Sequence, residues 1–426
     1  MPEFLAEYIK ELKSKSDRIG RDFVRDDIKN IGSFFNEYWV EFDLSDQPSN
    51  IDVLAIDSSS AVFPTNVGGL FYVVRGLGIA KNKNYKRIAT DFDYSSSKSE
   101  QEISRFLGMY REHMEHLVGL DSIADGYNGC ILLDGSIYGR LSHILSEYSF
   151  LNSSSKGLSI DYFEILAKFI KKCEDNRILL IGISKESRTS FFRDFLIERI
   201  LDDRGLEKKS RRDLLSLALK DKRKAIEKAE SMYDKEVVKL IEELTARIPD
   251  FQLITLHAKH PGYTKPLLLG ASQKKIEEYK RYVVDKRSLI KSSFPELSDN
   301  KDTFRRLSVL YDDLFNLPAI VSFHLLPKQI DTAMRIDVPS WYFGISKRII
   351  DVGWPEFVVN DEKINEILNI VSAGYCGLDN YNIWLNMVDL RVKLRKKDFE
   401  EIYLPEFEKI VGRFVTARGY RRDRYP

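Results

Sequence analysis

A chain of 426 residues can build a large core and more than one domain, and its 43% apolar and 12% aromatic content excludes an intrinsically disordered protein. Its 66 basic and 65 acidic residues leave a formal net charge of +1, so a surface for nucleic acid would require local segregation of charge. The cysteines Cys130, Cys173 and Cys376 form no C-x-x-C pair, which excludes a zinc ribbon and a disulfide framework and is typical of the reducing cytosol.

The N-terminal segment predicts a helical arm. Residues 3 to 40 carry apolar side chains at three- and four-residue spacing with charges between them, and we place the arm at residues 1–45, packed on the core. The first residues lack the apolar centre of a signal peptide. No apolar run in the chain reaches the roughly 18 residues that span a bilayer. We therefore expect a soluble, cytoplasmic protein with no membrane partner.

Two stretches share one pattern, an apolar strand that ends in an acid and continues with small residues. The first begins at Ile51 and ends at Asp57, where three serines follow and the strand is expected to break. The second runs from Cys130 to Asp134 and continues with Gly135-Ser136. If the two strands are neighbours in one sheet, their carboxylates can share a hard divalent cation such as Mg²⁺ or Mn²⁺.

A strand, a helix and another strand complete this region. Residues 68–80 predict a strand whose glycines mark strand ends or bulges, and no phosphate-binding glycine loop of the P-loop type occurs in the chain. Residues 99–120 predict a helix in which Glu115 lies beside the apolar stripe. The strand over residues 177–184 is followed by Lys185 and Arg188, which form either a phosphate contact or part of a solvated loop.

The second half of the chain alternates between helical and strand-like patterns. Residues 204–248 are rich in Lys, Arg and Glu and predict one or two amphipathic helices, with a charged face that is either solvated or bound to DNA or a partner. We interpret residues 204–300 as a largely helical insertion into a domain that spans 46–426. The further expected elements are strand-like and turn-like sequence over 251–270, a helix over 273–290, a hairpin of strands 319–326 and 334–338, and a helix over 361–373.

The last predicted helix begins near Tyr381 and carries a single acid, Asp389, in an otherwise apolar and then basic sequence. A buried carboxylate is costly unless it is paired or bound to a cation, so Asp389 is a further candidate ligand. Residues 391–426 contain 11 basic and 6 acidic residues. Arg and Tyr alternate at the end of this tail, which either grips phosphates and bases or is a frayed terminus.

Several motifs together resemble those of the NurA nuclease family. The strand that ends in Asp57 resembles the family's first acidic motif, and residues 111–115 resemble its helical R-x-x-hydrophobic-E motif, which favours Glu115 over Glu112. Residues 133–136 resemble its L-D-G-S motif and residues 182–185 its G-[VI]-S-K stretch. The last family motif usually reads Y-P-x-P-L-x-x-A-[DH]. Here Tyr381 and Asp389 are present, but both prolines and the alanine are replaced.

This resemblance implies an α/β fold with a ribonuclease H-like mixed-sheet core and a homodimeric, manganese-dependent DNA nuclease, with Mg²⁺ as the other possible ion. It implies 5′–3′ exonuclease and single-strand endonuclease activity in DNA end resection and double-strand break repair, with a HerA-type hexameric ATPase translocase as partner. The implied metal ligands are Asp57, Glu115, Asp134 and Asp389. Tyr381 would assist catalysis, and Lys185 and Arg188 would contact DNA phosphates.

Two other functions are compatible with the same residues. A non-catalytic DNA-binding or scaffold subunit of the same complex would have one or more of the acids misplaced or paired with Lys or Arg. A ribonuclease or a transposase-like enzyme would share the metal chemistry and differ in substrate.

Overall fold

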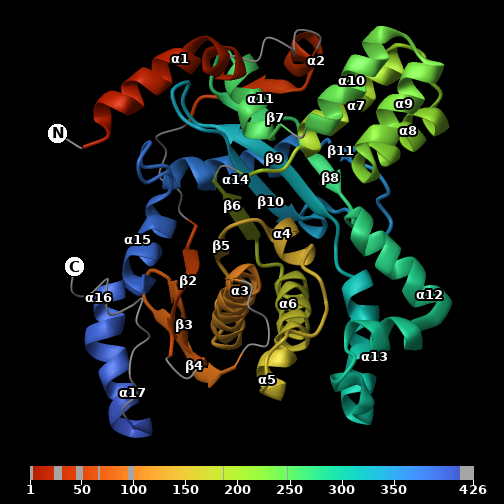
Figure 1. Cartoon of the computed structure of the whole chain (residues 1–426). Helices are drawn as coiled ribbons and strands as arrows, with labels where there is room; N and C mark the ends of the chain where they lie inside the picture. Colours follow the sequence, from red (N-terminus) through yellow and green to blue (C-terminus); the bar gives the residue numbers. More distant parts are fainter. Residues whose placement is uncertain are drawn as a thin grey trace. The chain divides into compact units, whose positions relative to one another are not determined.

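The computed structural model describes residues 3–23, 31–44, 51–65, 68–94, 100–185, 187–246 and 248–412 (Figure 1). The chain divides into two compact units. The larger contains residues 41–187 and 260–426, and the smaller contains residues 1–40 and 188–259. Strand β1 (Trp39–Glu41) crosses the boundary between them. The candidate acids all belong to the larger unit.

A mixed sheet forms the centre of the larger unit. Its strands are, in spatial order, β7 (Gly262–Thr264), β9 (Ile320–Leu326), β10 (Met334–Pro339), β6 (Leu180–Ser184), β5 (Cys130–Asp134), β2 (Val53–Pro64), β3 (Leu70–Ile79) and β4 (Asn84–Asp93). Strand β5 is parallel to both β2 and β6, whereas the other neighbouring pairs in this order are antiparallel. The short strand β8 (Leu267–Leu269) pairs with β9 and with β11 (Glu356–Phe357).

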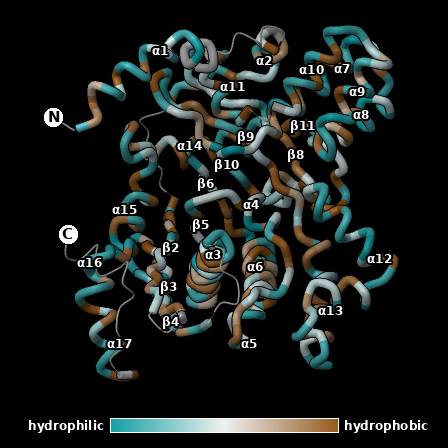
Figure 2. Tube along the Cα trace, in the orientation of Figure 1, coloured by the Kyte–Doolittle hydropathy of each residue, from teal (hydrophilic) through white to brown (hydrophobic). Residues whose placement is uncertain are grey.

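Helices cover the sheet on two sides. Helix α3 (Glu100–Ala124) packs on β2, β3 and β4, and α6 (Leu158–Asp175) lies beside α3 and connects β5 to β6. A parallel strand pair requires such a crossover. Helix α15 (Ile383–Val392) packs on β2 and β3, and Figure 1 shows it on the opposite side of these strands from α3. Apolar residues follow the central strands and the inner sides of α3 and α6 (Figure 2).

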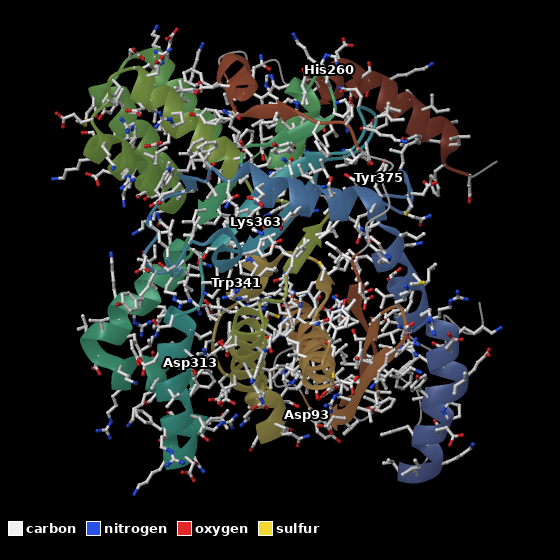
Figure 3. All side chains as sticks on the ribbon, turned by 180° about the vertical axis from the view of Figure 1, so that it is seen from behind. Asp93, His260, Asp313, Trp341, Lys363 and Tyr375 are labelled. Atoms are coloured by element: carbon white, nitrogen blue, oxygen red, sulfur yellow. The ribbon has the colours of Figure 1, made fainter. Side chains whose placement is uncertain are left out.

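A buried aspartate fixes the end of β4. The carboxylate of Asp93 (Figure 3) accepts hydrogen bonds from the backbone N–H groups of Leu151 and Asn152. The other elements of the larger unit are α4 (Ile137–Leu141), α5 (Ser153–Lys156), α12 (Gln273–Ser293), η2 (Leu297–Asp299), α13 (Lys301–Phe315), η3 (Ser340–Phe343), α14 (Asp361–Gly374), α16 (Lys396–Asp398), η4 (Phe399–Tyr403) and α17 (Leu404–Val411).

The described part of the smaller unit is helical apart from β1. Its helices are α1 (Leu5–Phe23), α2 (Gly32–Glu37), α7 (Phe191–Asp203), α8 (Lys208–Lys220), α9 (Lys222–Met232), α10 (Lys235–Ala246) and α11 (Asp250–His257). The described side chains of α1 are mostly exposed, and so is Phe4, which precedes the helix. This part of the arm therefore does not bury its apolar side chains on the core, as the sequence predicted it would. None of the described helices is long and apolar enough to cross a membrane.

The structure confirms the mixed α/β class and most predicted elements, with three corrections. Strand β2 does not break after Asp57, because the three serines continue the strand and pair with β3. Residues 250–257 form helix α11 where a strand-like segment was expected, and residues 208–246 form three helices in place of one or two. The domain boundaries predicted at 45, 204 and 300 remain predictions.

Candidate metal centre

The continuous pairing of β2 with β3 determines where the side chains near Asp57 point. Side chains alternate between the two faces of a sheet, and directly opposite residues share a face. Ser58 is opposite Gly76, and a Cβ at Gly76 would lie 3.1 Å from the main-chain oxygen of Met114 in α3. Ser58 therefore faces α3. Asp57 and Ser59 point to the other face, which α15 covers.

The glycines of β3 bring α3 close to the sheet. A Cβ at Gly78 would lie 2.7 Å from a methyl carbon of Val118, and one at Gly76 would lie 3.1 Å from the main-chain oxygen of Met114. Gly78 lies next to the end of β3, as the sequence predicted, whereas Gly76 lies within the strand. Because α3 lies so close to the sheet, the Glu115 carboxylate reaches Ser58, the residue after Asp57.

Glu115 is buried and accepts two hydrogen bonds. One comes from the Ser58 hydroxyl, and the other comes from the guanidinium of Arg140 in α4. Arg140 is buried as well and also donates to the main-chain oxygen of Asp134, at 3.1 Å. A carboxylate has about four lone-pair sites, so Glu115 retains acceptor capacity for a cation. Glu112, one turn earlier, interacts instead with His143 and Tyr162.

Asp57 and Asp134 lie at adjacent positions in neighbouring strands. The register pairs Ile56 with Leu133, and the two aspartates are the next residues along the parallel strands. Burial raises the pKa of Asp57 to about 7, and the negative charges of Glu115, Asp134 and Asp389 add to this effect. Burial also raises the pKa of Asp134, although Lys185 opposes the shift. Crowded carboxylates of this kind gain stability when a cation binds between them.

Tyr381 and Lys185 stand beside Asp134. The Tyr381 hydroxyl is buried and interacts with the Asp134 carboxylate, but it finds no hydrogen-bond partner of normal geometry in the described part of the chain. Burial, followed by the charge of Asp134, raises the pKa of Tyr381. The ammonium of Lys185 lies 3.6 Å from an Asp134 carboxylate oxygen and 3.9 Å from the centre of the Tyr381 ring. Lys185 therefore partly neutralises the acid cluster.

Asp389 is half-buried on α15, and its charge acts on both Asp57 and Asp134. The helix that carries it begins at the N-cap Asn382, whose side chain accepts a hydrogen bond from the Leu385 N–H. The start expected near Tyr381 is thus displaced by two residues, to Ile383. Asp389 is brought to Asp57 by tertiary packing alone, since more than 300 residues separate them in the sequence.

The loop after β5 is held by a buried polar network that sequence analysis missed. The Ser136 hydroxyl caps α4 and donates to Asp337 at 2.6 Å, and Asp337 also pairs with the buried Arg335 at 2.8 Å. Gly182 makes room for this loop, because a Cβ there would lie 2.7 Å from the Gly135 oxygen. The L-D-G-S motif (133–136) and the G-[VI]-S-K motif (182–185) therefore contact each other at this loop. Nothing in the spacing of the sequence identifies Arg140 or Asp337.

The donor set is suited to a hard divalent ion. It consists of carboxylates that are electrostatically coupled and a buried hydroxyl without a normal partner, and oxygen ligands of this kind bind Mn²⁺ and Mg²⁺. Among the described residues, no group of three or more His, Cys, Asp or Glu side chains already has the geometry to hold an ion. The residues fit such an ion by their chemistry.

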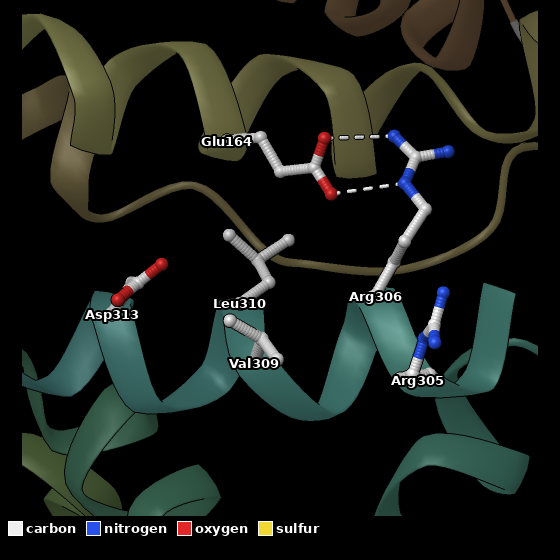
Figure 4. A pocket seen from close by; sticks show the side chains of 6 residues that line it. All are labelled: Glu164, Arg305, Arg306, Val309, Leu310 and Asp313. Carbon is white, nitrogen blue, oxygen red and sulfur yellow. Dashed lines mark hydrogen bonds and ion pairs between the residues drawn. The ribbon is translucent and has the colours of Figure 1, made fainter. Parts of the chain in front are cut away.

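Arg188 is exposed and belongs to the smaller unit, so its role in DNA binding stays a prediction. The Arg- and Tyr-rich end of the tail, residues 413–426, lies outside the described residues. A hollow of about 350 Å³ is lined by residues of α6 and α13, where Arg306 pairs with Glu164 (Figure 4). It shares no residue with the acid cluster.

The fold and the site define a mixed α/β protein with an acidic centre around the adjacent strands β2 and β5. The NurA domain model matches residues 51–394, which is most of the chain. The chain belongs to the NurA family. A comparison with curated protein sequences gives no match.

Solved structures of NurA proteins resemble the chain over nearly its whole length. The crystal structure of the NurA nuclease from Sulfolobus solfataricus shares 14% sequence identity with a TM-score of 0.54, and the match covers 96% of this chain and 98% of that one. A crystal structure of NurA bound to dAMP and manganese shares 14% identity with a TM-score of 0.43, covering 91% and 95% of the two chains. The first match shows a common fold.

Proposed function

We propose that this protein is a metal-dependent DNA nuclease with a ribonuclease H-like core. The observation that carries the proposal is the electrostatic coupling of four carboxylates around Asp57, in a chain that belongs to the NurA family. Mn²⁺ suits this donor set, and Mg²⁺ is the alternative. Asp57, Glu115, Asp134 and Asp389 would hold the ion or ions.

Each residue of the cluster has a distinct task in this proposal. The bound metal would activate water and stabilise the charge that develops on the leaving oxygen. Ser58 and Arg140 hold Glu115, in the way that outer-shell partners usually orient metal-binding carboxylates. Lys185 is placed to neutralise a phosphate of the substrate, and Tyr381 orients that phosphate or the attacking water.

The family relationship supports a more specific role. In this role the protein cleaves single strands and degrades DNA ends in the 5′–3′ direction, as a homodimer bound to a HerA-type hexameric ATPase, during end resection and double-strand break repair. Arg188 contributes a further DNA contact in the proposal.

The proposal predicts cleavage of DNA that depends on Mn²⁺ and is lost in Asp134→Ala. The assay compares 5′-labelled single-stranded and duplex DNA with RNA of the same sequence, with Mn²⁺, with Mg²⁺ and with EDTA. The expected result is DNA cleavage by the wild type only when metal is present, and intact RNA. The Asp175→Ala variant serves as control, because Asp175 is exposed on α6 and pairs with the exposed Lys171. Intact DNA under every condition, with and without the ATPase, would refute the proposal.

Removal of Lys185 is expected to strengthen metal binding and weaken DNA binding. Lys185→Gln deletes a positive charge 3.6 Å from Asp134, so Mn²⁺ should bind more tightly by about three- to tenfold, since a surface charge pair is worth about 1 kcal/mol. The KM for DNA should rise because a phosphate contact is lost. Calorimetry with Mn²⁺ and steady-state cleavage give the two values. Lys171→Gln is the control, and an unchanged Mn²⁺ affinity in Lys185→Gln would contradict the expectation.

A second function is favoured by a specific observation. Glu115 is paired with Arg140, and Asp134 lies near Lys185, which is the pattern expected of a non-catalytic subunit that binds DNA and docks on a translocase. Such a subunit would keep its cellular role in Asp57→Ala. Complementation of a strain that lacks the protein discriminates between the two functions, because the nuclease proposal requires that Asp57→Ala fail.

A further inference from the structure

The C-terminal end of α15 is bound by a side chain from the sheet. The last carbonyl groups of a helix have no partner within the helix. The Arg75 guanidinium on β3 donates to two carbonyls at this end, from Nε to Val392 at 2.6 Å and from Nη2 to Lys393 at 2.7 Å. A cation at a helix C-terminus also interacts favourably with the helix dipole. Arg75 therefore fixes this end of the helix to β3.

A second contact comes from the residue opposite Arg75. Ser59 pairs directly with Arg75 in the β2–β3 register, and its hydroxyl accepts a hydrogen bond from the Leu394 N–H at 2.9 Å. The third donor of Arg75, Nη1, contacts the Tyr403 hydroxyl at 3.1 Å. One strand pair thus binds both the end of α15 and the segment that follows it.

This anchor is close to both aspartates. Asp389 lies one turn before the bound carbonyls, and its own carbonyl accepts the Lys393 N–H at 2.9 Å. Asp57 is two residues before Ser59 on β2 and points to the same face. The strand that carries Asp57 therefore also holds the helix that carries Asp389.

We infer that Arg75 and Ser59 are positioning residues that hold α15 so that Asp389 can join Asp57 at the metal. The inference rests on the proposed metal-dependent function. Arg75 uses its donors on main-chain oxygens and a tyrosine hydroxyl, so its role is exerted through the helix. Arginine suits this role better than lysine, because its planar fork can reach two carbonyls at once.

A double-mutant cycle separates positioning from general stabilisation. The variants are Arg75→Gln, Asp389→Asn and the double variant, and Mn²⁺ affinity is measured by calorimetry on the full chain. Arg75→Gln should weaken Mn²⁺ binding by about tenfold, as loss of an outer-shell partner commonly does, and should leave the KM for DNA unchanged. In the double variant the affinity should equal that of Asp389→Asn alone. Additive losses would overturn the inference.

A conservative variant and a matched control sharpen the test. Arg75→Lys keeps the charge but cannot make both carbonyl contacts, so its affinity should lie between those of the wild type and Arg75→Gln. Arg87→Gln is the control, because Arg87 is on the neighbouring strand β4 and pairs with Asp121 of α3, at 2.6 Å. Its Mn²⁺ affinity should stay within about twofold of the wild type, because a surface pair is worth little. A loss equal to that of Arg75→Gln would show a general effect and overturn the inference.

Hydrogen exchange tests the anchor without metal. In metal-free protein, Arg75→Gln should speed amide exchange in residues 389–394 and leave α3 unchanged. Unchanged amide exchange at α15 would overturn the inference, whatever the Mn²⁺ affinities of the variants. Conversely, a wild type that binds no Mn²⁺ would refute the proposed function, while faster exchange would still show that Arg75 anchors the helix.

Discussion

Asparagine in place of Asp57 is expected to reduce metal-dependent DNA cleavage by about a thousandfold or more, and to make the metal-free protein more stable at pH 8. The first effect follows because a metal ligand that supplies several kcal/mol to the transition state is lost. The second follows because a buried acid surrounded by Glu115, Asp134 and Asp389 destabilises the fold when it is ionised.

The pH dependence of this second effect has a definite sign. The pKa of Asp57 is 3.8 in the unfolded reference and about 7 in the folded protein. Between these values the unfolded chain releases a proton that the folded state keeps, so stability falls as pH rises from about 4 to about 7 and stays low above it. A difference of about three pKa units corresponds to at most about 4 kcal/mol.

Urea denaturation in EDTA at pH 5 and pH 8 measures this dependence. The wild type should lose stability between the two pH values, and Asp57→Asn should lose less. Addition of Mn²⁺ at pH 8 should stabilise the wild type more than the variant, because binding to the folded state shifts the unfolding equilibrium. Asp175→Asn is the surface control. Equal losses of stability in the wild type and Asp57→Asn would show that ionisation of Asp57 does not destabilise the fold.

Removal of Arg140 is expected to cause the largest loss of stability in the site. Arg140 and Glu115 are both buried, with side chains 3% and 5% exposed, so Arg140→Met leaves an unpaired carboxylate in the interior. Such a change usually costs about 3–5 kcal/mol. The double variant Arg140→Met with Glu115→Gln removes both charges and should recover most of the loss.

Chemical denaturation of the single and double variants gives the coupling energy. The matched control is Arg306→Met, because Arg306 forms an exposed pair with Glu164 and should cost about 1 kcal/mol or less. If Arg140→Met costs no more than this control, the pair does not hold the site together. Mn²⁺ calorimetry on Glu115→Gln then tests whether Glu115 is a metal ligand. Mn²⁺ binding should weaken if Glu115 is a ligand, and should not change if Glu115 serves only to pair with Arg140.

Local sequence patterns were informative where a single strand or helix decides the outcome. The strand ends at Asp134 and the hairpin of β9 and β10 follow from apolar runs bounded by polar residues, and both are present in the structure. The three serines after Asp57 continue the strand through pairing with β3. The consecutive residues Ser58 and Ser59 find partners on opposite faces, Glu115 on one and Leu394 on the other. A run of three small hydroxyl residues gives no sign of such partners.

By itself, the sequence determined the acids, the mixed α/β class and the family resemblance, because these depend on residue type, periodicity and motif order within short segments. The approach of Asp389 to Asp57, the pairing of Glu115 with Arg140 and the anchoring of α15 by Arg75 were decided only by the tertiary structure. These contacts join segments up to about 330 residues apart. Their formation depends on sheet register and on the close approach of helices at glycine positions, which no local pattern encodes.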